Sequence, residues 1–306
     1  MNIIGVIYIK HSLETGAYGT GGGVPTDATE ATHFTDANYT DDRGTMLEDC
    51  TDAYMYPRAD GGALKVDGSL EGTFRPVAQA SLLNSLFGAV AGGVYTLDMC
   101  VPTTLQIGEK VGAVTRARNY YGVGVGKAEF TFATKEYVRV SYDWISSQAV
   151  DTTYDTTPTY SAENPLVFWR ATLTLGTDPI VAKEATLSID RALDDDQFVL
   201  GQFTRYRLTQ TDMTKITGSI TLTENQIDMV KIAQYGAKTN SAVAATNDLG
   251  AGTIKFTCLK TGGTAGCEFE VPVVFDSFDF KGSKVSEFGK VVNFTAVGSG
   301  FKLTVS

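Results

Sequence analysis

The sequence predicts an all-β protein made of two tandem sandwich or barrel domains, with one helix in each. The first reason is composition. The 306 residues include 32 Gly and 8 Pro, and Thr, Val, Tyr and Phe are frequent throughout, which is typical of many short strands joined by glycine turns. The second reason is a repeat. The stretch KVDGSL at 65–70 returns as KITGSI at 215–220, 150 positions later in a chain of 306 residues.

Two further landmarks recur in the same order after each copy of this stretch. A helical segment ends at Gly88 in the first copy and at Gly236 in the second, and a Phe-x-Phe strand follows at 130–132 and at 278–280. Both landmarks are displaced by 148 positions. We therefore expect an internal duplication, with a first domain at 1–150, a linker at 151–165 and a second domain at 166–306.

The first domain has its clearest strand at the repeated stretch. Apolar residues and glycines alternate with polar residues over 64–74, the period of two that marks a strand with one buried face. Pro76 suits the first turn of a helix whose apolar side reaches Phe87, and Gly88 ends that helix. Further strands are expected at 3–9, 94–97, 105–107, 130–132 and 138–144.

Residues 24–62 are expected to form a long arm within the first domain. The stretch is rich in Thr, Asp, Ala and Tyr and shows no sustained hydrophobic period. A stretch of that length without regular structure either binds something or is a solvated excursion, and both alternatives stay open.

The second domain is expected to repeat the order of elements without an arm of equal length. Thr223 and Gln226 have the spacing of a capping box, in which each side chain satisfies a backbone N–H of the other residue, so a helix should begin there and end at Gly236. Strands are expected at 166–175, 185–189, 203–208, 216–222, 253–259, 269–275, 278–280, 291–297 and 301–305.

The charge balance argues against a protein that grips DNA. The chain has 25 Lys plus Arg against 35 Asp plus Glu, a net charge of −10, whereas binding a phosphate backbone needs clustered cations. The apolar run at 3–9 has neither a basic stretch before it nor a cleavage site after it, and no stretch reaches the roughly 18 apolar residues of a membrane span. We therefore expect no signal peptide, no membrane partner and synthesis in a cytoplasm.

The cysteines and histidines do not have the spacing of a metal site. Neither a C-x-x-C pair nor an H-E-x-x-H motif occurs among Cys50, Cys100, Cys258, Cys267, His11 and His33. We expect no metal and no cofactor. Cys258 and Cys267 flank a glycine-rich turn and could form a disulfide across a hairpin, but a reduced, packed pair is favoured.

Two stretches have some features of ligand sites, and neither completes the pattern. The run GVGVGK at 122–127 has Tyr121 where a P-loop needs its first Gly and Ala128 where it needs a hydroxyl, which favours a glycine-rich strand. The acidic run at 194–196 is followed by Gln197, which breaks the spacing of a calcium loop. No nucleophile with a neighbouring base is evident, so we expect no enzyme; a hydrolase or lyase would need scattered carboxylates to converge in space.

Five motifs stand in a distinctive order along most of the chain. They are ETGAYGT at 14–20, VDGSL at 66–70 before a Leu-rich helix, YGV at 121–123 at the start of a strand, ATLSID at 185–190 and ITGSI at 216–220. In this order they resemble the tube proteins, also called major tail proteins, of long-tailed bacterial and archaeal viruses. The likeness is to the variant in which one chain carries two tube domains.

The resemblance implies a β-sandwich with a flanking helix, whose inner sheet joins those of neighbouring subunits into a closed barrel. Rings of such barrels would stack into a hollow virion tail tube through which DNA passes without specific binding. One-domain tube proteins form six-membered rings, so the resemblance implies that a two-domain chain would close as a trimer with pseudo-sixfold symmetry. Closure would also remove the unpaired strand edges of an open sheet. The implied partners are further copies of the chain and other tail proteins, namely the tape measure, the terminator and the baseplate or tip.

Two groups of residues follow as candidate sites. The polar faces of the two repeated strands are expected to line the channel, where an acidic wall would repel phosphates; the alternative is that they meet solvent or another sheet. These residues are Asp67, Ser69, Glu71, Thr217, Ser219 and Thr221. The arm is expected to become ordered on the adjacent ring, and its candidate contacts are Tyr39, Asp41, Asp42, Tyr54 and Tyr56.

An alternative function is that of another β-sandwich component of a virion or cell surface, such as a capsid decoration or an adhesion module. Such a protein would present an exposed ligand patch and stay monomeric or form isolated trimers. A tube protein would instead polymerise.

Overall fold

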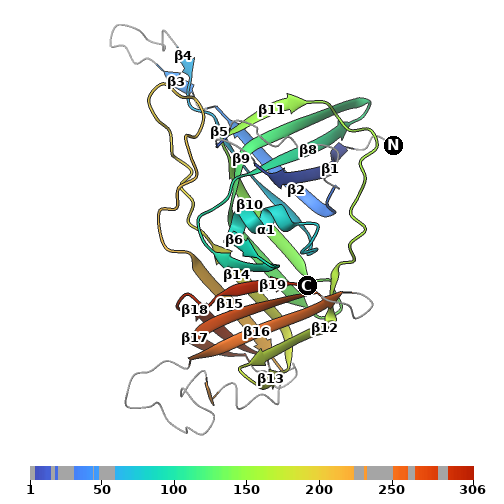
Figure 1. The fold of residues 1–306 in the computed structure, drawn as a ribbon, viewed down its shortest axis with the longest axis vertical. Coiled ribbons are helices and arrows are strands. Elements are labelled where there is room, and N and C mark those ends of the chain that lie inside the picture. The colour runs from blue at the N-terminus through green and yellow to red at the C-terminus, as the bar shows by residue number, and fades with distance from the viewer. Residues whose placement is uncertain are drawn as a thin grey trace.

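The computed structural model describes residues 4–14, 18–19, 31–43, 45–47, 59–223, 231–232, 251–260, 266–281 and 289–306. This part of the chain is almost entirely β-structure; its helical residues are those of α1 (Ala80–Phe87) and the pair 231–232 (Figure 1). The predicted all-β class is confirmed.

In the first half, the strands form two layers that share one long strand. Its first part belongs to one layer and its second part to the other, and the chain crosses between them near Gly122, whose φ is 62°. The first layer contains β1 (Ile4–Leu13), β8 (Thr103–Val111), the shared β9 (Val114–Ala133) and β11 (Gln148–Thr152). The second layer contains β9, β10 (Arg139–Ser146), β5 (Lys65–Thr73) and β2 (Phe34–Asp42), and β6 (Gly88–Ala91) and β7 (Val94–Leu97) follow α1.

The second half repeats this order of pairing. Its strands are β12 (Leu166–Leu175), β13 (Asp178–Ile180), β14 (Ala182–Asp190), β15 (Lys215–Leu222), β16 (Ala251–Lys260), β17 (Cys267–Lys281), β18 (Gly289–Ala296) and β19 (Lys302–Val305). The order β1-β8-β9-β10-β5-β2 in the first half corresponds to β12-β16-β17-β18-β15-β14 in the second. β19 pairs with the first part of β17 as β11 pairs with the first part of β9.

Irregularities in the ladders also recur. In the first half, the register between β2 and β5 shifts between Phe34 and Asp36. In the second half, the register between β14 and β15 shifts between Ala182 and Glu184, 148 positions later. The β9–β10 and β17–β18 ladders each contain one shift as well. Because a bulge fixes the register of a strand, the same bulges give the two halves the same face assignments.

The ladders correct one equivalence that the sequence spacing predicted. Phe130 lies opposite Val140, and Phe280 lies opposite Lys290, 150 positions later. Phe130 therefore corresponds to Phe280 and not to Phe278. The spacing could not show this, because a difference of two residues keeps the same face of a strand.

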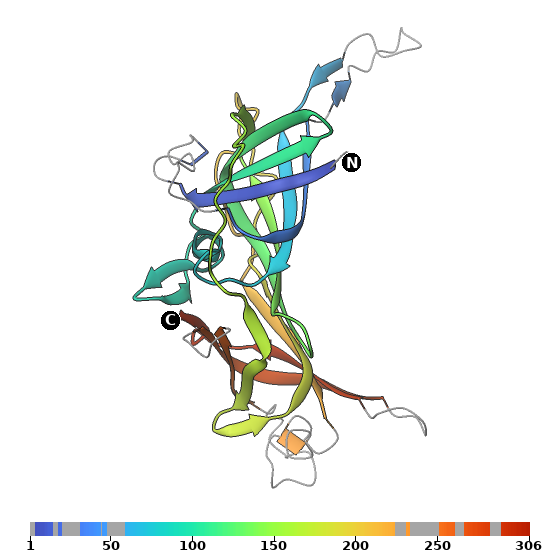
Figure 2. The same ribbon diagram turned by 90° about the vertical axis from the view of Figure 1, so that its right-hand side faces the viewer.

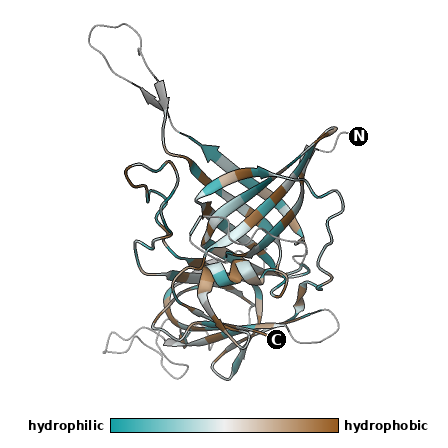
Figure 3. Cartoon of the chain, turned by 45° about the horizontal axis from the view of Figure 1, so that its top comes forward, coloured by the Kyte–Doolittle hydropathy of each residue, from teal (hydrophilic) through white to brown (hydrophobic). Residues whose placement is uncertain are grey.

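The two halves share one apolar core. Leu70 on β5 and Tyr142 on β10 are fully buried, and Phe130 of the first half lies against Phe269 of the second, with ring centroids 4.9 Å apart. Apolar and polar residues alternate along the strands that enclose this core, as the colouring in Figure 3 shows. Burial of apolar surface between the halves therefore stabilises their mutual arrangement.

Part of the expected arm is a strand. β2 pairs with β5 over its length and belongs to the sandwich, whereas β3 (Thr45–Leu47) and β4 (Ala59–Gly61) pair with each other and project from the body (Figures 1 and 2). The sequence period missed β2 because Thr, Asp and Asn replace aliphatic residues there. Its contacts with the core come from Phe34, Ala37 and Tyr39.

The expected strand at 203–208 is wrong. Residues 191–214 connect β14 to β15 without a named strand, and buried Arg205 donates hydrogen bonds to the backbone oxygens of Val66 and Ser146 at 2.7 and 2.6 Å. This connection corresponds to residues 43–64 between β2 and β5 and has nearly the same length. The part of the arm that follows β2 therefore has an equivalent of similar length in the second half, contrary to the prediction, whereas residues 14–33 before β2 correspond only to 176–181.

The helix of the first half begins later than its sequence suggested. Residues 76–79 form turns, and α1 ends at Phe87 before Gly88, whose φ is 93°. The helix expected between Thr223 and Gly236 lies outside the described residues, apart from 231–232, which are helical.

Candidate functional site

One antiparallel run of strands crosses both halves of the chain. Its order is β17-β18-β15-β14-β9-β10-β5-β2, eight strands in which β14 of the second half pairs with β9 of the first. At this seam, Leu187 lies opposite Phe130 and Ser188 lies opposite Glu129. The two halves are thus joined by a backbone ladder as well as by the core.

Both ends of this run are open in the part of the chain that the structure describes. β2 pairs with β5 along one edge, and no strand within the described residues pairs along its other edge. At the opposite end, β16 covers β17 only as far as Val274, which leaves one edge of residues 275–281 without a strand partner among the described residues. Unpaired N–H and C=O groups on a strand edge allow another chain to add a strand there.

The predicted channel residues of the first half lie on one face of β5. Asp67 and Glu71 are exposed and Ser69 is half-buried, whereas Val66 and Leu70, which alternate with them, are fully buried. The apolar face thus packs on the core and the polar face points away from it.

The predicted channel residues of the second half lie on the corresponding face of β15. Thr217, Ser219 and Thr221 are half-buried and alternate with buried Ile216, Ile220 and Leu222. The hydroxyl oxygens of Ser219 and Thr186, its neighbour on β14, are 2.9 Å apart. The ladders connect the two groups, since one row of directly opposed residues runs through Glu71, Ser141, Glu129, Ser188 and Thr217.

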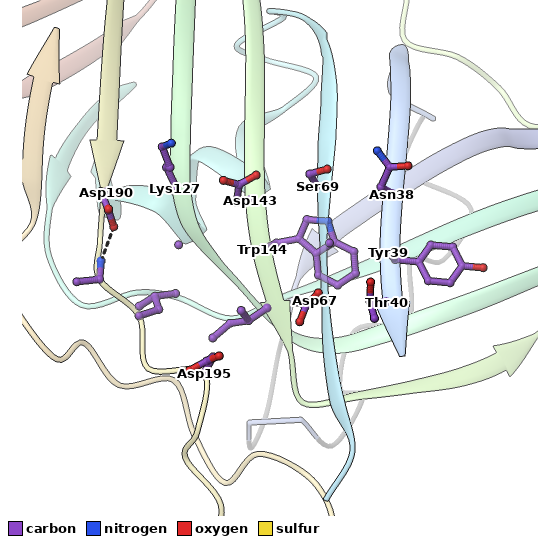
Figure 4. A pocket seen from close by; sticks show the side chains of 15 residues that line it. Asn38, Tyr39, Thr40, Asp67, Ser69, Lys127, Asp143, Trp144, Asp190 and Asp195 are labelled. Atoms are coloured by element: carbon purple, nitrogen blue, oxygen red, sulfur yellow. Dashed lines mark hydrogen bonds between the residues drawn. The ribbon is translucent and has the colours of Figure 1, made fainter. Parts of the chain in front are cut away.

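Residues from neighbouring strands complete this polar face, and their positions in the sequence do not reveal that they belong to it. Figure 4 shows a second row across five strands, in which successive neighbours are Asn38, Ser69, Asp143, Lys127 and Asp190. They line an open depression on the surface. The alternation within each strand was visible in the sequence, but only the long-range pairing shows that these strands share a face.

The polar face carries more carboxylates than cations. Its described carboxylates are those of Asp36, Asp42, Asp67, Glu71, Glu129, Asp143, Glu184 and Asp190, and its described cations are those of Lys65, Lys127, Arg139 and Lys215. Lys127 Nζ lies 4.0 Å from Glu129 Oε2, so part of the positive charge is already compensated. The face is therefore polar with an acidic excess.

The predicted arm residues divide between β2 and the undescribed part of the chain. The Tyr39 hydroxyl donates a hydrogen bond to the Glu109 carboxylate, and Asp41 forms an ion pair with Arg118. Burial, together with this hydrogen bond, raises the pKa of Tyr39 above its ordinary value. Asp42 is exposed at the end of β2, whereas Tyr54 and Tyr56 lie outside the described residues. Tyr39 and Asp41 thus contact their own sandwich.

The described residues contain no group of three His, Cys, Asp or Glu side chains that could hold a metal ion. The glycine-rich run 122–127 lies within β9, and the Asp194 carboxylate accepts a hydrogen bond from the N–H of Asp196 at 2.9 Å, which is a local turn. Within the same residues, no helix is long and apolar enough to cross a membrane.

A comparison with protein families found one whose description is phage tail tube protein, and its profile matches residues 14–282. No curated protein matches the chain significantly. The matched range begins at the end of β1 and ends just after β17, so every strand of the eight-strand run except β18 lies inside it.

Proposed function

The chain belongs to the phage tail tube protein family, and from this premise we propose that it polymerises into stacked rings that form a hollow tube through which viral DNA passes. Members of this family are structural, so the chain is a structural component of the virion tail rather than an enzyme. The polymer, its symmetry and the passage of DNA are the parts that we propose.

The observation that carries the proposal is the run of eight strands, each end of which has an edge without a strand partner in the described part of the chain. Joining one end of the run to the opposite end of another copy is a head-to-tail contact, which closes into a ring when the rotation between copies is right. Closure pairs every edge of the sheet. Since each chain contributes two similar halves, which we attribute to internal duplication, three copies would give a ring of pseudo-sixfold symmetry.

We assign the polar face of the run to the inside of the tube. The opposite face carries Val66, Leu70, Ile216 and Ile220, which are buried in the core, so it is not available to line a channel. An acidic excess on the inner wall would repel phosphates and let DNA pass without adhering. Asp67, Ser69 and Glu71 with Thr217, Ser219 and Thr221 would then belong to the wall.

The proposed partners are further copies of the chain, the tape measure, the terminator and the baseplate or tip. We propose that the chain is made in the host cytoplasm and assembles there into the tail. A binding site for a specific DNA sequence is not part of this function, because an acidic wall does not provide the cations that hold a phosphate backbone.

Electron microscopy of the concentrated protein tests polymerisation. Negative-stain images should show rings and hollow filaments of uniform width. A capsid decoration or adhesion module would remain monomeric or form isolated trimers. Finding only such particles at every concentration would contradict the proposal.

Labelling of an introduced cysteine tests which face lines the tube. Ser69→Cys should react with a small maleimide in both free and assembled protein, but with a bulky polymer-linked maleimide only before assembly. Asp98→Cys is the matched control, because Asp98 is exposed and its backbone N–H donates a hydrogen bond to the Phe87 oxygen at the end of α1, whose apolar residues pack on the core side of the sheet. If the bulky reagent labels the Ser69→Cys variant equally in tubes and in free protein, the assignment is refuted.

A further inference from the structure

The chain contains one complete junction between two halves, and it consists of an edge strand and the connection that follows it. β14 adds to the second part of β9, with 184–190 paired to 127–133 in register. The connection 191–214 then folds over the first half. Arg191, directly after β14, donates hydrogen bonds to the oxygens of Leu86 and Phe87 at the end of α1, at 2.8 and 3.2 Å. Such contacts satisfy helix carbonyls that lack a partner within the helix.

Each partner in this junction has an equivalent, and the corresponding edge of that equivalent has no strand partner among the described residues. β2 corresponds to β14, because each pairs with one of the two repeated strands at its equivalent glycine. Tyr39 lies opposite Gly68 on β5, and Leu187 lies opposite Gly218 on β15. The second part of β17 corresponds to that of β9, because both pair with equivalent strands in registers 150 positions apart. β14 pairs with one edge of β9. The equivalent edge of β17 has no strand partner along residues 275–281 among the described residues.

We propose that β2 of one copy adds to residues 275–281 of β17 in a second copy, in the register of the internal junction. In the internal junction Ser188 lies opposite Glu129. The residue of β2 equivalent to Ser188 is Thr40, 148 positions earlier, and the residue of β17 equivalent to Glu129 is Asp279, 150 positions later, so Thr40 would lie opposite Asp279. Asn38 then lies opposite Lys281, and Asp42 lies opposite Ser277. This inference rests on the proposed polymerisation and adds to it the two edges that meet and their alignment.

The same equivalence assigns the place of the projecting hairpin. Arg43 follows β2 as Arg191 follows β14, 148 positions later, and β3 and β4 stand in the connection that corresponds to 191–214. The connection 191–214 lies against the neighbouring half, whereas the β3–β4 hairpin projects from the body of a single chain (Figures 1 and 2). The hairpin therefore covers the second half of the next copy within the same ring, and not the adjacent ring.

Disulfide cross-linking of assembled protein tests the register. The double variant Thr40→Cys with Asp279→Cys, oxidised after assembly, should give covalent species that end at the closed ring on a non-reducing gel. The internal control is Ser188→Cys with Glu129→Cys, which should cross-link within one chain and run as a monomer. The mismatched control is Thr40→Cys with Ser277→Cys, in which the cysteines are two residues out of register and should link much less. Mass spectrometry of the digested product identifies the linked pair and excludes native cysteines.

The outcomes separate this inference from the proposed function. If microscopy shows rings or tubes, but the 40–279 pair does not link or the 40–277 pair links better, the register is wrong and the tube remains. If the Thr40→Cys single variant gives efficient 40–40 dimers, the edges meet symmetrically and the inference is wrong. If the unmodified chain gives no rings or tubes at any concentration, the proposed function is contradicted together with this inference.

Protease digestion tests the place of the hairpin. If it covers a neighbour in the same ring, isolated unstacked rings should protect the peptide bonds of 45–47 and 59–61 from cleavage, compared with free chains. Protection that appears only when rings stack would show that the hairpin contacts the adjacent ring, and would overturn this part of the inference.

Discussion

Gly68 on β5 lies directly opposite Trp144 on β10, and the indole ring occupies the space that a side chain at Gly68 would need. A Cβ atom there would lie 2.6 Å from Trp144 Cζ2 and 2.3 Å from the backbone oxygen of Asn38. In the second half, Gly218 lies opposite Phe294, and its Cβ would lie 2.3 Å from Phe294 Cζ and 2.4 Å from the oxygen of Thr186. The glycine of the repeated stretch is thus explained by an aromatic ring on the adjacent strand in both halves.

Gly68→Ala should therefore destabilise the fold. The new methyl group overlaps both Trp144 and a backbone oxygen, and overpacking of this kind costs about 1–3 kcal/mol. Urea unfolding followed by tryptophan fluorescence measures the loss. Gly126→Ala is the matched control in the same sheet, since its Cβ would approach no atom closer than 3.8 Å, and it should change the free energy of unfolding by less than about 0.5 kcal/mol. Equal effects of the two substitutions would refute the steric explanation.

Arg205→Met should destabilise the attachment of the connection 191–214. The Arg205 side chain is buried and donates hydrogen bonds to the oxygens of Asp195, Val66 and Ser146 at 2.8, 2.7 and 2.6 Å. Removing these donors should cost about 2–4 kcal/mol in the free energy of unfolding. Exposed Arg207→Met is the control and should have little effect. A calorimetric comparison that finds the two variants equally stable would contradict this role.

Stability should fall as the pH is lowered from about 6.5 towards 4 because of His11. Burial lowers the pKa of His11 from 6.5 to about 4, and its ring nitrogens contact the hydroxyls of Ser81 and Thr32. The unfolded chain therefore binds a proton that the folded chain does not, so this contribution is fully present above pH 6.5 and is lost as the pH approaches 4. A depression of this size corresponds to about 3 kcal/mol.

Unfolding measured across this pH range checks the contribution of His11. In His11→Gln the slope of the free energy of unfolding against pH should be smaller than in the unmodified protein, by one proton at most. An unchanged slope in His11→Gln would show that other groups cause the acid sensitivity.

Cys258 and Cys267 should resist alkylation in the folded protein. They lie opposite each other on β16 and β17, both are free thiols, and burial raises the pKa of Cys267 well above its ordinary value. Burial keeps the reagent away from both thiols, and the raised pKa of Cys267 lowers its fraction of thiolate, which is the reactive form. Iodoacetamide labelling followed by mass spectrometry should find them unmodified until denaturant is added. Rapid labelling without denaturant, or a mass that fits a disulfide, would contradict this prediction.

The repeated strands could be predicted from the sequence because each one has a strict apolar and polar alternation. The faces of β5 and β15 and the end of α1 at Gly88 follow from local residue patterns alone. β2 could not be predicted, because Tyr39 and Ala37 supply its core contacts in a stretch that is otherwise rich in Asp and Thr. Its strand conformation depends on the partner β5, which lies far away in the sequence.

The candidate surface could be predicted only in part for the same reason. Ser69 and Glu71 could be predicted because they lie on the repeated strand and alternate with its apolar residues. Asp143 and Asp190 share their face only through pairings between distant strands. The strand predicted at 203–208 failed because side-chain spacing does not reveal whether the backbone has a ladder partner. There, buried Arg205 holds the segment in place by donating hydrogen bonds to the backbone oxygens of Val66 and Ser146.

The ladder between β14 and β9 forms within a single polypeptide, which changes the thermodynamics of closing a ring. In a circle of three such chains, half of the contacts between neighbouring sandwiches arise during folding, at an effective concentration set by the tether and not by the amount of protein synthesised. Association then costs the translational and rotational entropy of three bodies instead of six. Assembly should consequently begin at a lower subunit concentration than it would if the same sandwiches were made as separate chains.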